Sequence, residues 1–205
     1  MEPESSCRCS AGTLYILTEI RNVHTVVEFE KILVLVQRVY RQGQTILNCQ
    51  DCSKVPPQSS SFTIPALTDH CLPLFEAVCS AYSITRNNCF FDPNILSFEQ
   101  PLPQFICVRS KVQLGETDLD EVETGMLVRT LLCRNSMRLL SLLEALHGTL
   151  QRISTDNAQV HQARATALQA YELSIQSSMH RMALFLEQIK IEQRMDFILC
   201  PSMKC

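Results

Sequence analysis

The chain has 205 residues, of which 46% are hydrophobic, and it carries a formal net charge of −3. This length and composition allow a buried core and exclude a chain that is disordered by composition. With only 5 glycines and no tryptophan, turn-rich β architectures and glycine-rich phosphate loops are disfavoured. The weakly acidic balance provides no bulk electrostatic attraction to nucleic acid.

No apolar stretch reaches the roughly 18–20 residues that a membrane span needs. The N-terminus, MEPESSCRCS, lacks the basic and apolar regions of a secretory signal, so we expect an intracellular protein. In a reducing compartment its 11 cysteines should be buried small hydrophobes or metal ligands rather than disulfides. Several of them lie inside apolar helical patterns, which favours burial: Cys71, Cys79, Cys107 and Cys133.

Apolar residues recur every three or four positions over 12–47, which predicts helix with a break at Asn22–Thr25. Residues 7–52 are therefore expected to form an N-terminal helical pair. The following segment, SKVPPQSSSFTIPAL (53–67), is rich in proline and serine and is predicted to be a linker.

Residues 68–150 are predicted to hold the central helices. The first should span roughly 69–83, with Pro73 either in its first turn or at a kink. The next stretch, 84–114, contains Asp92-Pro93, Pro101 and Pro103, which favour extended or turned backbone, so this stretch is expected to be irregular.

The best-signalled helix follows Thr117 and Asp118, either of which is a good N-cap, with Asp120 or Glu121 completing a capping box. It should run to about Leu146 and end at His147-Gly148. Its apolar arc predicts a core-facing side, and its packing residues are expected to be Leu139, Leu142, Leu143 and Leu146.

A long last helix is predicted over roughly 157–198, within a segment that spans 155–199, and Thr155 or Asp156 is expected to cap it. Small residues recur along one side and would let another helix approach closely, from this chain or from a partner: Ala163, Ala167 and Ala170. The predicted fold is all-α, a single-domain helical bundle with a long C-terminal helix and an irregular Pro-rich middle segment.

Asn135 falls in the middle of the leucine arc, where a buried amide is costly unless it forms a hydrogen bond. It either meets a backbone group, or lies where the arc reaches solvent, or fixes the register of a helix–helix contact within the chain or across a dimer.

Two segments carry a family resemblance. Residues 7–52 read CRCSAGTLYILTEIRNVHTVVEFEKILVLVQRVYRQGQTILNCQDC, an amphipathic helix pair between Cys-x-Cys and Cys-x-x-Cys. Residues 111–147 contain VQLGETDLDEVETGMLVRTLLCRNSMRLLSLLEAL, in which a glycine and an acidic cap precede a leucine-rich helix. This order resembles the C-terminal regulatory region of aflatoxin-regulatory-type fungal zinc-cluster transcription factors.

The resemblance implies a nuclear regulatory domain that acts by protein–protein interaction on a fungal secondary-metabolite (mycotoxin-type) gene cluster. Its partner would be an activator subunit or a coactivator, or a second copy of the chain. The six-cysteine zinc module of that family is missing here, so direct DNA binding is not expected from this chain alone. A protein-interaction module outside transcription and a truncated activator remnant are the alternatives.

The four cysteines that flank the N-terminal helical pair are the candidates for a metal site: Cys7, Cys9, Cys49 and Cys52. Four thiolates would suit tetrahedral zinc. A turn at Asn22–Thr25, however, gives arms of roughly 15 Å and 35 Å, which would leave the two pairs about 20 Å apart. We therefore predict neither metal nor other cofactor.

No catalytic motif occurs: the nucleophile elbow, the zincin motif and the nucleotide loops are all absent. The acidic residues at 116–123 suit the positive end of a helix, so we expect no enzyme. The less favoured alternative is an enzyme with a cryptic Cys/His pair. Basic and acidic residues balance from 151 onward and form no stripe for nucleic acid.

Overall fold

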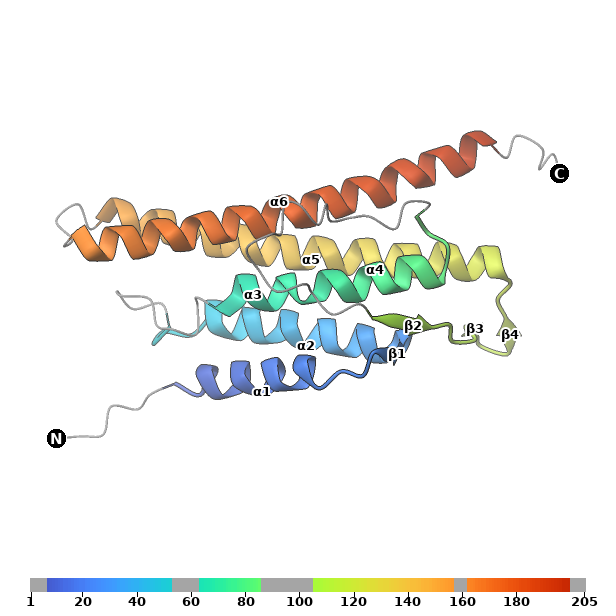
Figure 1. Cartoon of the computed structure of the whole chain (residues 1–205), viewed down its shortest axis with the longest axis horizontal. Coiled ribbons are helices and arrows are strands. Elements are labelled where there is room, and N and C mark those ends of the chain that lie inside the picture. The colour runs from blue at the N-terminus through green and yellow to red at the C-terminus, as the bar shows by residue number, and fades with distance from the viewer. Residues whose placement is uncertain (1–6, 53–62, 86–104, 157–161, 200–205) are drawn as a thin grey trace.

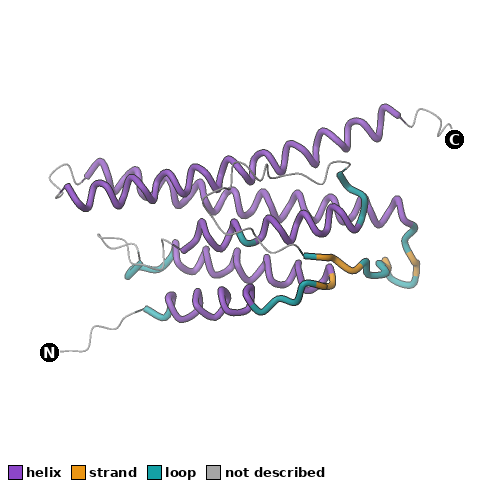
Figure 2. Tube along the Cα trace, viewed as in Figure 1, coloured by secondary structure: helices purple, strands orange, loops and turns teal. Residues whose placement is uncertain are grey.

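The computed structural model describes residues 7–52, 63–85, 105–156 and 162–199. Within these segments the helices lie side by side along one long axis, and the strands are only two or three residues long (Figures 1 and 2). The predicted all-α class is confirmed.

The N-terminal pair consists of α1 (Cys9–Arg21) and α2 (Phe29–Leu47). The predicted break lies between them, and the connection contains the short strand β1 (Val26–Glu28). Apolar residues at three- and four-residue spacing give α2 one buried face, which is why it packs along the bundle rather than standing apart. The residues buried from α2 are Phe29, Ile32, Leu35, Val36, Val39, Gly43 and Ile46.

The linker predicted over 53–67 is wrong in its last part, because α3 (Ile64–Asp69) begins there; residues 53–62 lie outside the described part of the chain. Pro65 stands in the first turn of α3, where a backbone N–H has no helical acceptor and its loss costs nothing. The next helix, α4 (Cys71–Ala81), is shorter than the predicted 69–83 and carries Pro73 in its own first turn.

A parallel ladder joins distant parts of the chain. Strand β2 (Ile106–Val108) pairs with β1, with Val27 opposite Cys107. Two further strands, β3 (Gln113–Leu114) and β4 (Thr117–Asp118), form a small antiparallel hairpin ahead of the next helix. Strands β2 and β3 occupy part of the segment 84–114 that was predicted to be irregular, of which 86–104 lie outside the described residues.

Helix α5 (Glu121–Asp156) starts with a reciprocal capping box. The Asp120 carboxylate accepts a hydrogen bond from the Glu123 backbone N–H at 2.8 Å, and the Glu123 carboxylate accepts one from the Asp120 N–H at 3.0 Å. The predicted N-caps Thr117 and Asp118 are wrong, because both belong to β4. A box centred on Asp120 satisfies two N–H groups at once, which neither earlier residue does here.

The predicted helix end at His147-Gly148 is also wrong, because α5 continues to Asp156. Glycine inside a helix costs only about 1 kcal/mol relative to alanine, and burial of Leu150 beyond it offsets that cost. Consequently Thr155 and Asp156 close α5 instead of capping the last helix, α6 (Gln162–Leu199). Residues 157–161, which join the two, lie outside the described part.

The core has two parts. The larger part surrounds α4 and contains the stacked rings of Phe75 and Phe185, whose centroids are 5.6 Å apart. The smaller part, here called the second core cluster, gathers the N-terminal end of α1, the C-terminal end of α2, and the facing stretches of α5 and α6. Its buried members are Cys9, Ile46, Cys52, Ile64, Leu142, Leu143, Leu146, Leu150, Tyr171 and Ile175.

Gly43 lets α2 approach α5 closely. A Cβ atom at this position would lie 2.3 Å from Leu142 Cδ2, and Leu142 is completely buried. We expect Gly43→Ala to lower the free energy of unfolding by about 1–3 kcal/mol through overpacking. Gly148→Ala is the matched control, because nothing lies within 4 Å of its Cβ position and helix propensity alone predicts a gain of about 1 kcal/mol. Denaturant unfolding measures both, and equal stability of Gly43→Ala and wild type would contradict the close approach.

Glu76 is a carboxylate of α4 that the fold partly buries. Its Oε1 has no hydrogen-bond partner among the described residues, and burial raises the pKa of Glu76 from 4.5 to about 7. The folded state therefore binds a proton more readily than the unfolded chain, so this residue's contribution to stability falls as pH rises from 4.5 to about 7. We expect Glu76→Gln to be stabilising at pH 8 and to have no such advantage at low pH. Thermal unfolding across this range measures the difference, and a gain that is independent of pH would contradict the assignment.

Candidate functional site: a four-cysteine cluster and an apolar groove

The structure brings together the four cysteines that flank the N-terminal helical pair. The sulfur atoms of Cys7, Cys9, Cys49 and Cys52 all lie within 4.8 Å of one another. The expectation that the two pairs lie about 20 Å apart was therefore wrong. No other group of three or more potential ligand side chains of this kind is found in the described part of the chain.

The two arms match in length because the chain does not turn back immediately after α1. Helix α1 has 13 residues and α2 has 19, which correspond to about 20 Å and 28 Å. Between them the chain continues beyond the end of α1 as the extended segment that includes β1, and only then reverses into α2 (Figure 1). The extended segment makes up the difference in length between α1 and α2, so both Cys pairs lie at one end of the bundle.

Local backbone geometry stabilises a thiolate at Cys49. Backbone N–H groups of Cys52 and Asp51 donate to its sulfur, with the Cys52 bond the larger influence, and they lower the pKa of Cys49 from 9.0 to about 7. Cys9 stands in the first turn of α1, where the helix dipole favours negative charge. Within the cluster, it is Cys49 whose thiolate form is favoured by backbone hydrogen bonds.

The surroundings of Cys9 shift its pKa in the opposite direction from that of Cys49, because burial outweighs the favourable helix dipole. It is buried in the second core cluster, and burial raises the pKa of its thiol. Its backbone carbonyl accepts a hydrogen bond from Gln42 Nε2 at 2.9 Å, so α2 fixes the position of the first turn of α1. Without a cation to compensate its charge, a Cys9 thiolate would be costly here.

A groove of about 800 Å³ runs along the other end of the same helical pair. Tyr15 of α1, Val26 of β1 and Val34 of α2 line it and are 66%, 55% and 42% exposed. The Arg38–Glu19 and Lys31–Glu28 ion pairs also line the groove, beside apolar side chains that remain open to solvent. Sequence reasoning missed this groove, although Leu14, Tyr15, Ile16 and Leu17 make α1 apolar on more than one face.

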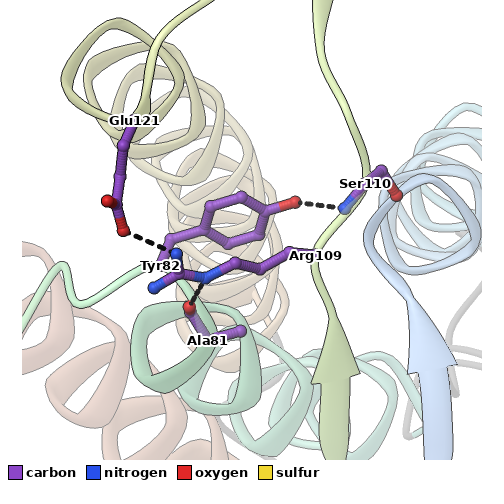
Figure 3. Close-up of polar contacts among 5 residues, drawn as sticks. All are labelled: Ala81, Tyr82, Arg109, Ser110 and Glu121. Carbon is purple, nitrogen blue, oxygen red and sulfur yellow. Dashed lines mark hydrogen bonds and ion pairs between the residues drawn. The ribbon is translucent and has the colours of Figure 1, made fainter.

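A polar junction holds the end of α4, the segment after β2 and the start of α5 together (Figure 3). Arg109 donates to the carbonyl oxygen of Ala81 and, at 2.6 Å, to the Glu121 carboxylate, and its guanidinium lies 5.8 Å from the Tyr82 ring centroid. The Tyr82 hydroxyl accepts a hydrogen bond from the Ser110 N–H at 2.9 Å. Since these groups bond to one another, we assign the junction a structural role.

The leucines predicted to carry packing are all buried, each at 3% exposure or less: Leu139, Leu142, Leu143 and Leu146. Asn135, 4% exposed, donates a hydrogen bond from Nδ2 to the Leu131 carbonyl oxygen at 2.8 Å. This contact is to the backbone of its own helix, which corresponds to the first of the three alternatives for this residue.

The small-residue side of the last helix is described only in part. Ala170 and Ser174 are exposed, whereas the side chains of Ala163 and Ala167 lie outside the described part. Leu173 and Leu184 on α6 are also exposed, at 60% and 50%. The described stretch therefore leaves this side uncovered by the chain itself.

The electrostatics of Cys49 predicts its reactivity in metal-free, reduced protein. At pH 7 we expect Cys49 to be alkylated by iodoacetamide about tenfold faster than Cys133, because only the thiolate reacts and burial raises the pKa of Cys133. The rate at Cys49 should fall as pH drops below about 7. Peptide mass spectrometry measures both thiols in one sample, so Cys133 is an internal control, and equal rates would contradict the assignment.

The chain matches no protein-family model, no curated protein and no solved structure. None of the helices in the described segments combines the length and hydrophobicity required to cross a membrane.

Proposed function

We propose that this chain is a regulatory domain that acts in transcription by binding another protein, and that its binding surface is the groove between α1, β1 and α2. The domain would act in the nucleus on a fungal secondary-metabolite gene cluster. Its partner would be a zinc-cluster activator or a coactivator, and the partner would make the contact with DNA.

The groove is the observation that carries the binding part of the proposal. Protein interfaces combine an apolar, aromatic centre with a polar rim. Tyr15, Val26 and Val34 supply the centre, and the Glu19–Arg38 and Glu28–Lys31 ion pairs supply the rim. Exposed apolar groups gathered in a concave surface of this size favour a partner that covers them.

The transcriptional part of the proposal is supported by the resemblance of residues 7–52 and 111–147 to the regulatory region of aflatoxin-regulatory-type factors. The first of these segments is the one that forms α1, β1 and α2 and hence the groove. The weak net charge of −3 agrees with a role in which a partner contacts the nucleic acid.

A tethering experiment in fungal cells tests the proposal. The full chain is fused to an unrelated DNA-binding module, and transcript from a reporter carrying that module's sites is measured. We expect the fusion to change reporter transcription several-fold, and Tyr15→Arg or Val34→Arg to abolish the change, because a charge in the apolar centre would have to be desolvated on binding. Co-precipitation with zinc-cluster activators expressed in the same cells should fall in parallel.

Leu14→Arg is the matched control, because Leu14 is on the same helix as Tyr15, is 64% exposed, and does not line the groove. Leu173→Arg serves the same purpose for α6. Loss of activity with the control variants and not with the groove variants would reject the groove as the surface. Association without any transcriptional effect would place the interaction outside transcription.

A further inference from the structure

We propose that Cys7, Cys9, Cys49 and Cys52 bind one Zn²⁺ ion as thiolates, in a closed tetrahedral site that fastens the start of α1 to the end of α2. This inference does not depend on the transcriptional role proposed above. It rests on where the fold brings the four sulfur atoms and on what surrounds them.

The spacing of the sulfur atoms fits a single ion. Zinc–thiolate bonds of about 2.3 Å in a tetrahedron place the sulfurs about 3.8 Å apart. The four sulfurs here lie within 4.8 Å of one another, so small side-chain adjustments complete the tetrahedron. The ligands come in two pairs, Cys7 and Cys9 at the start of α1 and Cys49 and Cys52 just after the end of α2, and the packing of these helices brings the pairs together.

The surroundings support thiolates bound to a cation. Backbone N–H groups of Cys52 and Asp51 point at the Cys49 sulfur, an arrangement that orients a ligand and stabilises its charge. Gln42 donates a hydrogen bond to the Cys9 carbonyl oxygen and thereby orients one of the two buried cysteines of the cluster. Arg8 and the cysteines at 7, 9 and 49 line a pocket of about 630 Å³, which gives an ion a path to the site.

The donor set selects zinc among the common ions. Four thiolates in tetrahedral geometry suit Zn²⁺ or an iron–sulfur cluster, and a single central position enclosed by four sulfurs suits one ion. Binding would release one proton from each thiol that is not already ionised, and the resulting centre would carry a charge of −2. The positive N-terminal end of α1 and the neighbouring Arg8 offset part of that charge.

A disulfide is the competing use of these thiols. The closest pair, Cys7 and Cys52, has a sulfur–sulfur separation of 3.3 Å, compared with about 2.05 Å for a bonded pair. None of these four cysteines forms a disulfide in the structure. One disulfide would use only two of the four sulfurs and would not account for the close approach of the other two.

The expected consequence of binding is structural. Cys9 and Cys52 belong to the second core cluster, so an ion held there would fix the start of α1 against the end of α2, in the same cluster as the buried leucines of α5. Structural zinc sites contribute directly to folding, because the ligands are not assembled in the unfolded chain.

Metal analysis tests the proposal with the full chain, purified under reducing conditions without chelator. We expect close to one zinc per chain by mass spectrometry of the metal. Replacement by Co²⁺ should give the visible absorption of tetrahedral cobalt and a thiolate-to-cobalt charge-transfer band. Zinc uptake should weaken as the pH falls, because protons compete for the thiolates.

Two variants separate loss of the site from loss of the fold. Cys7→Ser removes a half-buried ligand close to the described N-terminus, and should lower zinc content while the helical circular dichroism signal remains. Cys133→Ser, which changes a half-buried cysteine of α5 outside the cluster, should keep zinc at the wild-type level. In hydrogen exchange, a chelator should remove protection from residues 9–21 of wild type, and added zinc should restore it.

Four results would overturn the proposal. The first is reduced wild-type protein that neither contains zinc nor takes up Zn²⁺ or Co²⁺. The second is iron in place of zinc, either as a single ion or, if inorganic sulfide accompanies it, as an iron–sulfur cluster. The third is a disulfide between these cysteines in protein whose thiols were trapped at lysis. Equal loss of zinc from Cys133→Ser would show that the cluster does not hold the ion.

Discussion

Burial of one leucine-rich face of α5 determines where every neighbouring helix lies. Leu132 and Leu139 contribute to the core around α4, and the leucines from 142 to 146 contribute to the second core cluster. Helices α2, α3 and α6 all contact α5, so their positions are set by the same continuous face. Hydrophobic burial is roughly proportional to the apolar area removed from water, so this face of α5 stabilises both parts of the core.

The position of helix α1 depends on α5 only indirectly, through α2. It packs on α2, and contacts near its two ends determine its position: Gln42 holds the carbonyl of Cys9 near the first turn, and Arg38 pairs with Glu19 near the last. The cysteine cluster lies at one of these ends and the apolar groove at the other. A change that loosens α1 would therefore alter both the cluster and the shape of the groove.

The helical class, the break between α1 and α2, and the buried leucines of α5 could be predicted from periodicity, because each depends on local spacing. The boundaries of α5 could not. The choice among Thr117, Asp118 and Asp120 as cap depends on the β3–β4 hairpin, and helix beyond Gly148 depends on burial of Leu150 against its surroundings. Tertiary packing overrides local propensity at both places.

The candidate site was partly visible in the sequence. The Cys-x-Cys and Cys-x-x-Cys pairs were identified, but their separation depended on the path of the chain between the helices. Helix lengths alone could not reveal the extended segment at β1, since its conformation is stabilised by pairing with β2, a segment about 80 residues away in the chain. The groove was not found because it arises only when α1, β1 and α2 meet.

The pairing of β1 with β2 also has a consequence for the order in which the molecule folds. Bringing together segments about 80 residues apart costs about 4 kcal/mol in loop-closure entropy, and a ladder of three residue pairs returns little. The α1–α2 hairpin has only a short connection to close, so it can form while the rest of the chain is still being synthesised. The two helices that carry the cysteine pairs would then meet before β2, α5 and α6 have left the ribosome, and the later pairing with β2 would fix the extended segment that aligns the two pairs.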